Sequence, residues 1–109
     1  MLFANTPNPP YYAVIFTSQR NEKDDDGYHS MADLMVELAS KQPGFLGIES
    51  TRDENGLGIT VSYWDSIESI QQWKENHFHM GAQEKGKKDW YSSYKTRICK
   101  VERDYTNSI

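Results

Sequence analysis

The sequence predicts an α+β protein whose elements follow the order β-α-β-β-α-β, and three observations support this prediction. Four segments have the apolar–polar alternation, or the β-branched and aromatic composition, of strands. Two segments repeat apolar side chains at the spacing of amphipathic helices. Asn55-Gly56 separates the second and third strand-like segments and is a strong hairpin signal. The expected strands are residues 11–18, 45–53, 57–65 and 90–105, and the expected helices begin near Asp24 and Asp65.

The first expected strand, YYAVIFTS, is largely apolar on both of its faces. Val14 and Phe16 point to one side of it, and Ala13 and Ile15 point to the other. We therefore expect this strand to be covered on both sides.

The first expected helix has a clear start and a clear end. Asp24 to Asp26 place negative charge at the positive end of the helix dipole and offer an N-cap. Pro43 moves Gln42 out of helical geometry, and Gly44 completes the exit. The face expected to dock on the sheet carries Met31, Leu34, Met35 and Leu38.

The third expected strand has one face made of small side chains. Gly58, Thr60 and Ser62 share this face, and they leave room above the sheet for helix side chains or for a ligand. The other face carries Leu57, Ile59, Val61 and Tyr63.

The second expected helix follows a capping signal. Asp65 is the expected N-cap, and Glu68 completes an Asp version of the capping box. Gly81 and Gly86 oppose one straight helix, so we expect a break between His77 and Gly81 and a second short helix after it. The inward stripe consists of Ile67, Ile70, Trp73 and His77.

This element order predicts the ferredoxin-like fold. Two right-handed crossovers give a four-stranded antiparallel sheet with both helices on one face. The other face would leave apolar side chains in water, and an exposed patch of that kind marks association. We expect a second copy to stack on it face to face, as a homodimer.

Composition limits the class of protein and its partners. A chain of 109 residues with 37% apolar and 26% charged residues is typical of one soluble globular domain. The net charge of −4 and the scattered basic residues predict no nucleic-acid partner, and no apolar run reaches the roughly 18 residues of a membrane span. Residues 1–10 are expected to be a flexible N-terminal arm without signal-peptide features, which predicts a cytoplasmic protein, and residues 11–109 form the domain. Cys99 is expected to be a buried, inert thiol.

Four segments carry a resemblance that spans residues 11–105: QPGFLGIES, GITVSYW, WKENHFHMGAQ and WYSSYKTRICKVERDY. Together they resemble the antibiotic biosynthesis monooxygenase (ABM) family, in its branch of small single-domain bacterial proteins. The resemblance implies a dimeric α+β barrel with a pocket between helices and sheet in each subunit. Family members differ in activity, so the fold alone does not choose a function.

The resemblance first implies a cofactor-independent monooxygenase that acts on a small phenol-like or quinol-like aromatic compound with O₂. A deprotonated electron-rich phenol can itself donate an electron to O₂, so the protein supplies a dry pocket, aromatic walls and polar groups. His79 or His77 is the expected base, because histidine titrates near neutral pH. The predicted site residues are His79, Trp73, Gln83, Asn76 and Arg97, with Trp64, His77 and Phe16 along the substrate pocket.

Two of these residues also fit a purely structural interpretation. Trp73 and His77 lie on the inward stripe of the second helix, where core packing explains both. His79 and Gln83 match the His-x-x-Ala-Gln pattern of the family branch, which turns His79 toward the pocket after a break near Gly81.

Two alternatives remain open at this point. The same barrel can be a non-catalytic small-molecule-binding or stress-related protein. A haem-degrading protein needs an iron-ligating His ten positions after Trp73, where this chain has Gln83, and an Asn on the first strand, where it has Phe16 to Ser18. We therefore do not expect haem. We do not expect a metal either, because His77 and His79 at i and i+2 point to different helix faces.

Overall fold

The computed structural model describes residues 3–21, 23, 25–79 and 90–107, without the side chains of residues 77–79. Its elements follow the predicted order β-α-β-β-α-β. The bounds are β1 Tyr11–Arg20, α1 Asp25–Ser40, β2 Phe45–Arg52, β3 Leu57–Trp64, α2 Ile67–His79 and β4 Tyr91–Val101.

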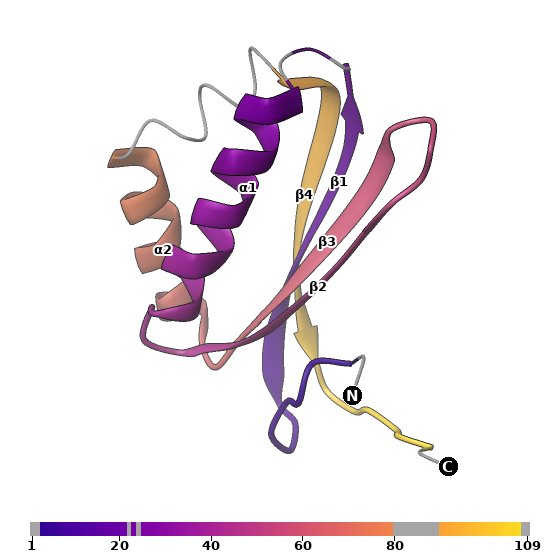
Figure 1. Cartoon of the computed structure of the whole chain (residues 1–109). Coiled ribbons are helices and arrows are strands. Elements are labelled where there is room, and N and C mark those ends of the chain that lie inside the picture. The colour runs from indigo at the N-terminus through magenta and orange to yellow at the C-terminus, as the bar shows by residue number, and fades with distance from the viewer. Residues whose placement is uncertain (1–2, 22, 24, 80–89, 108–109) are drawn as a thin grey trace.

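The sheet has four strands in the order β2-β3-β1-β4, and every neighbouring pair is antiparallel. Both helices lie on the same face of this sheet (Figure 1). The predicted ferredoxin-like α+β fold is therefore confirmed. We call the face beneath the helices the covered face and the opposite face the open face.

Strand register sorts the side chains between these two faces. Val14 lies between Ser62 and Ile98, while its neighbour Ile15 lies between Val61 and Arg97. Because side chains alternate along a strand, the first three of these residues share one face and the last three share the other. The two-sided apolar character predicted for β1 is thus real, and only one of its sides lies beneath helices.

Helix α1 docks on the sheet through only part of the predicted stripe, since Met31 and Met35 face the sheet and Leu34 does not. Leu34 is 43% exposed, whereas Ala39 is buried. The small side chains of Ala32 and Ala39 allow the helix backbone to approach the sheet closely, which rotates Leu34 to the flank. The residues of α1 that face the sheet are Tyr28, Met31, Ala32, Met35 and Ala39.

The N-cap of α2 also differs from the prediction. Ser66 is the cap, because its Oγ accepts a hydrogen bond from the backbone N–H of Ser69 at 3.1 Å. The Asp65 carboxylate instead accepts a bond from the Ser69 hydroxyl at 2.8 Å. Gly44 lies against this turn, where a Cβ would come within 2.1 Å of the Ser69 Oγ.

The core lies where the two helices meet the sheet near the start of α2. Trp64 is fully buried, and Ile70 and Ala39 pack in the same cluster. Trp73 stacks on Trp64 with 6.2 Å between ring centroids, while Ile67, which was expected to face inward, is exposed. Helix α2 runs to His79, and the predicted break and short helix after it lie outside the described residues.

The open face receives both ends of the described chain, which lie beyond the same end of the sheet (Figure 1). In the N-terminal segment, the backbone N–H of Ala4 donates to the Glu49 carboxylate at 2.9 Å. Cys99 is exposed on β4, so the prediction of a buried thiol was wrong. The prediction failed because strand β4 is at the edge of the sheet, and its open-face residues have no helix above them.

Candidate functional site

A cavity of about 410 Å³ lies on the covered face, between the sheet and the two helices. It is largely apolar. Its walls come from every strand and from both helices, and residues that line it include Val14, Phe16, Tyr28, Met35, Ile48, Ser50, Thr60, Ser62, Trp64, Trp73, Lys74, Tyr91, Tyr94, Thr96 and Ile98.

Small hydroxyl side chains form part of the cavity floor. Ser50 on β2 and Thr60 on β3 are hydrogen-bonded to each other at 2.8 Å. Ser62 accepts a hydrogen bond from the indole N–H of Trp64 at 2.9 Å. The cavity thus lies above the small face of β3, where the sequence predicted room for helix side chains or for a ligand.

Indole rings wall one end of the cavity. Trp64 and Trp73 are nearly parallel, with 24° between the ring planes, and Phe45 meets Trp64 edge to face at 5.5 Å. Trp64 is held from three sides, so its ring is a rigid wall. Such rings offer flat apolar surface for an aromatic ligand.

A second aromatic cluster closes the cavity where α1 begins and β4 begins. Tyr91 meets Phe16 at 5.4 Å and Tyr28 at 6.0 Å, in both cases edge to face. Trp90 packs on Tyr28 at 6.0 Å, and Tyr94 lies 5.7 Å from Phe16. This end therefore differs from the indole end because it carries phenol hydroxyl groups.

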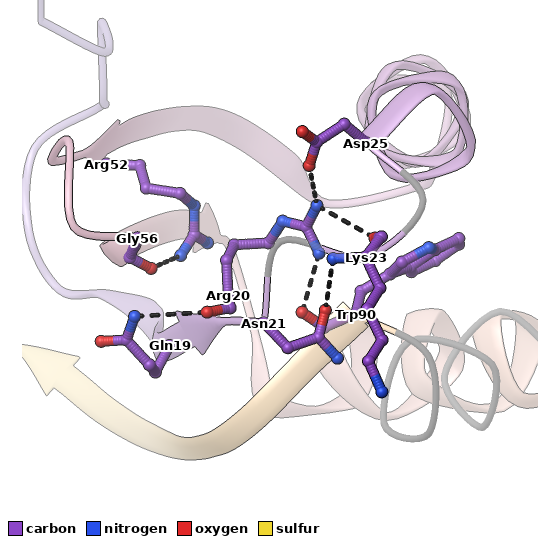
Figure 2. A network of polar contacts seen from close by, with 8 residues as sticks. All are labelled: Gln19, Arg20, Asn21, Lys23, Asp25, Arg52, Gly56 and Trp90. Atoms are coloured by element: carbon purple, nitrogen blue, oxygen red, sulfur yellow. Dashed lines mark hydrogen bonds and ion pairs between the residues drawn. The ribbon is translucent and has the colours of Figure 1, made fainter.

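The cation Arg20 is buried next to this cluster. Figure 2 shows its contacts with Asp25 and with Trp90. Its guanidinium donates to the backbone carbonyl of Trp90 at 2.8 Å and to the Asp25 carboxylate at 2.6 Å. It also lies 4.0 Å from the centroid of the Tyr28 ring, in a cation–π contact. Arg20 thus ties the end of β1 to the first turn of α1 and the start of β4.

A second cation, Arg52, lies flat across Gly58 on the covered face. A Cβ at Gly58 would come within 2.5 Å of the Arg52 Cζ, so the guanidinium fills the space that a larger side chain would take. Arg52 donates to the carbonyl and to the hydroxyl of Ser18. It also donates to the Gly56 carbonyl (Figure 2). Among the described residues Arg52 forms no ion pair, whereas Arg20 is paired with the Asp25 carboxylate. In the described part of the chain, this end of the cavity therefore has two guanidinium groups and one carboxylate paired with them.

The hydroxyl of Tyr91 remains protonated in this environment. Burial raises the pKa of Tyr91 above its ordinary value, and the neighbouring Tyr28 hydroxyl, to which it is hydrogen-bonded, adds to the increase. Arg52 and Arg20 act in the opposite direction. A neutral phenol beside two cations is a hydrogen-bond donor rather than a base.

The structure brings together three of the predicted site residues. Trp73, Trp64 and Phe16 line the cavity. Asn76 is half-buried on α2 and does not line it, and Arg97 faces the open side of the sheet opposite Ile15. Arg97 does not line this cavity, because its strand parity places it across the sheet. The side chains of His77 and His79, and all of Gln83, lie outside the described residues.

The phenol and guanidinium groups at the second end were not predicted as site residues. Strand parity was the available signal, since Arg20 continues the inward series of Val14 and Phe16, and Arg52 continues that of Ile48. Arg20 at the end of β1 and Arg52 at the end of β2 both lie against the Tyr28 ring of α1. Long-range strand pairing brings these parts of the chain together.

The open face carries a second, polar group of side chains around a cavity of about 330 Å³. Tyr63 donates to Glu49 at 2.6 Å, and Tyr11 donates to Asp104 at 2.5 Å. Burial raises the pKa of both phenols, and the carboxylates raise them further. Each phenol hydroxyl thus already donates its hydrogen bond to a carboxylate of the same chain.

Two further observations concern metals and membranes. In the part of the chain that the structure describes, His, Cys, Asp and Glu side chains form no group of three that could hold a metal ion. None of the helices in that part is both long enough and apolar enough to cross a bilayer.

The fold and the cavity define a class: ferredoxin-like α+β domains with an aromatic-walled chamber between helices and sheet. The chain belongs to the antibiotic biosynthesis monooxygenase family, whose model matches residues 10–85. It is 54% identical over 100 residues to YqjZ of Bacillus subtilis (strain 168), an uncharacterized protein, and the match covers 92% of this chain and 87% of YqjZ.

Solved structures share the fold at low sequence identity. A mutant of SnoaB, a cofactor-independent oxygenase from Streptomyces nogalater, is 7% identical with a TM-score of 0.75, and the match covers 89% of this chain and 98% of that one. PA3566 from Pseudomonas aeruginosa is 14% identical with a TM-score of 0.68, over 91% of this chain and 99% of that one. At these identities the likeness establishes the fold alone.

Proposed function

We propose that this protein is a cofactor-independent monooxygenase that oxidises a small phenol-like or quinol-like aromatic compound with O₂ in the covered-face cavity. One observation carries the proposal: a cavity of about 410 Å³ with indole and phenol walls and a hydroxyl-lined floor, in a chain of this family. Flat aromatic walls suit a planar ring, and the few polar groups can orient its oxygens.

The proposed reaction needs no external reductant. In a quinol, one ring C–H becomes C–OH while the two hydroxyl groups become quinone carbonyls. One atom of O₂ stays on the ring, and the other leaves as water with the two hydrogens that the substrate releases, so the substrate supplies all four electrons. The protein orients the ring, excludes water and accepts the first proton.

Roles follow for the predicted residues. Trp73 and Trp64 hold the ring between the helices and the sheet. His79, the last residue of α2, is the proposed base, and Gln83 is the proposed holder of substrate oxygens. These roles remain predictions that mutants must test.

We further propose that the active protein is a homodimer joined through the open face. Leu57 and Ile59 are exposed there, and Ile15 and Val61 are only half-buried. A second copy stacked on this face would remove that apolar surface from water. The small aromatic compound would then bind on the far side of each sheet, one molecule per subunit.

Oxygen uptake tests the function. Wild-type protein, dialysed against EDTA, is mixed with a panel of naphthols, naphthoquinols and anthrones while an electrode records dissolved O₂. We expect uptake of one O₂ per product with no added flavin or metal. Trp73→Phe and His79→Ala should each slow it by about 10- to 100-fold. Binding without uptake would instead indicate a non-catalytic binding protein.

A further inference from the structure

Tyr28 and Tyr91 form a pair at one end of the covered-face cavity. Tyr28 lies in the first turn of α1, and Tyr91 is the first residue of β4. Both line the cavity, with their rings perpendicular and 6.0 Å apart. Their hydroxyl groups are hydrogen-bonded to each other.

Counting protons shows that this pair has a donor to spare. Two phenols carry two hydroxyl protons, and their mutual hydrogen bond uses one of them. Neither hydroxyl has another hydrogen-bond partner among the residues that the structure describes. The second proton is therefore available to an acceptor that enters the cavity.

The surroundings favour an acceptor that carries negative charge. Arg52 lies 5.8 Å from the ring centroids of both Tyr28 and Tyr91, and no carboxylate of the described chain pairs with it. Arg20 lies 4.0 Å from the Tyr28 ring, and its charge is balanced by Asp25. Buried or half-buried positive charge of this kind is stabilised by an anionic or strongly polarised oxygen nearby.

The hydroxyl groups of the cavity floor also have protons to donate. Ser50 and Thr60 share one hydrogen bond between two hydroxyls, and Ser62 accepts from the indole N–H of Trp64. The Tyr28–Tyr91 pair differs from them because Arg20 and Arg52 lie against its rings.

We propose that the Tyr28–Tyr91 pair recognises an oxygen at the edge of an aromatic ligand: a phenolate, a phenol hydroxyl or a quinone carbonyl. The ring itself would lie against Phe16 and Tyr94, which flank Tyr91. This inference rests on the proposed function for its ligand class, but it concerns binding and not turnover. It makes the pair a specificity determinant, which orients the ligand with its oxygen toward the start of β4.

Three probes separate oxygen recognition from apolar burial. Naphthalene, 2-naphthol and 1,4-naphthoquinone have similar area and differ in their oxygens. Binding of each to the dialysed full-length protein is measured by equilibrium dialysis. We expect wild-type protein to bind 2-naphthol and the quinone about 10-fold more tightly than naphthalene, the effect of one hydrogen bond next to positive charge.

Matched hydroxyl deletions locate the effect. Tyr91→Phe and Tyr28→Phe should each erase most of the preference for the oxygenated probes and leave naphthalene affinity unchanged. Tyr94→Phe removes a hydroxyl from the same wall outside the pair and should keep the preference. Circular dichroism checks that each variant is folded, and Tyr91→Trp, which keeps an N–H donor, should restore part of the preference that Tyr91→Phe loses.

Each outcome bears on the proposal. Equal affinity of the wild type for all three probes, no binding of any probe, or an equal loss in Tyr94→Phe would overturn it. Preference that follows the pair, without any oxygen uptake, would overturn the monooxygenase and leave the recognition pair standing. Oxygen uptake without any preference for the oxygenated probes would overturn the recognition pair and leave the monooxygenase standing.

Discussion

The two faces of the sheet use the same side chain, tyrosine, for opposite purposes. On the open face, Tyr11 and Tyr63 each donate to a carboxylate, Asp104 and Glu49. On the covered face, Tyr28 and Tyr91 bond to each other beside two guanidinium groups. Burial raises the pKa of the phenol in Tyr63 and in Tyr91, so burial alone does not distinguish the faces.

The charge of the neighbour makes the difference. A carboxylate accepts the hydrogen bond of the phenol hydroxyl, so that proton is no longer available to a ligand. A guanidinium can only donate, so the phenols beside it keep a proton to give. The open-face pairs therefore act as ties: Glu49 also accepts from Ala4, and Asp104 belongs to the C-terminal segment. The covered-face pair is suited to binding.

The largest effect should come from the core beneath the cavity. Trp64 is fully buried and holds Trp73, so Trp64→Ala leaves a large void at the covered face. We expect a loss of about 3–5 kcal/mol in the free energy of unfolding. Urea denaturation measures it, and Tyr105→Ala is the control, because Tyr105 is 87% exposed. A loss below about 1 kcal/mol would mean that the indole wall is not part of the core.

A substitution on the open face should change dimerisation rather than folding stability. Ile59→Lys places a charge in the proposed dimer interface and should weaken dimerisation by roughly 100-fold. Sedimentation velocity at micromolar concentration measures this, and Leu34→Lys is a matched control because both side chains are 43% exposed. In the monomeric variant Cys99 should also react faster with iodoacetamide. A wild type that sediments as a monomer would contradict the interface.

Two glycines sharpen the comparison further. A Cβ at Gly58 on the covered face meets the Arg52 guanidinium at 2.5 Å, and one at Gly47 on the open face meets the Ala4 side chain at 2.7 Å. Gly58→Ala should displace Arg52 from Ser18 and Gly56 and cost about 1–2 kcal/mol. Gly47→Ala should cost less, because the N-terminal segment can move aside. Both values come from urea denaturation, and the reverse order would show that Arg52 contributes little.

The smallest effect is a dependence on alkaline pH. The folded-state pKa of Tyr63 lies above its unfolded value of 10.0, first because of burial and then because of Glu49. Its contribution to stability is therefore complete below pH 10 and declines as the pH rises toward the folded value. Tyr63→Phe should reduce the decline in unfolding free energy between pH 9.5 and 11 by at most about 1 kcal/mol per pH unit. Tyr105→Phe should not change that slope, and an unchanged slope in Tyr63→Phe would count against the tie to Glu49.

Much of the fold could be predicted from local patterns. The hairpin follows from Asn55-Gly56, and Gly56 does adopt a positive φ of 89°. The space on the covered face follows from the small residues of β3, and Trp64, Trp73 and Phe16 line it. These predictions succeeded because alternation within a strand needs no knowledge of distant residues.

The failures have one cause in common. Leu34 was expected to face the sheet because it is apolar, but Ala32 and Ala39 allow a closer approach. Arg97 was a candidate holder of substrate oxygens, with a solvent-facing position as the alternative, and its register opposite Ile15 places it on the open face. Both outcomes depend on which neighbour an element meets, and local patterns do not contain that information.

By itself the sequence determined the order of elements, the hairpin and the two-sided apolar strand, because each depends on residues within a few positions of one another. The tertiary structure decided the phase of α1, the face of Arg97, and the meeting of Arg20, Arg52, Tyr28 and Tyr91. These depend on packing density and strand register, which bring together residues far apart in the chain, such as Arg20 and Trp90, which are 70 positions apart.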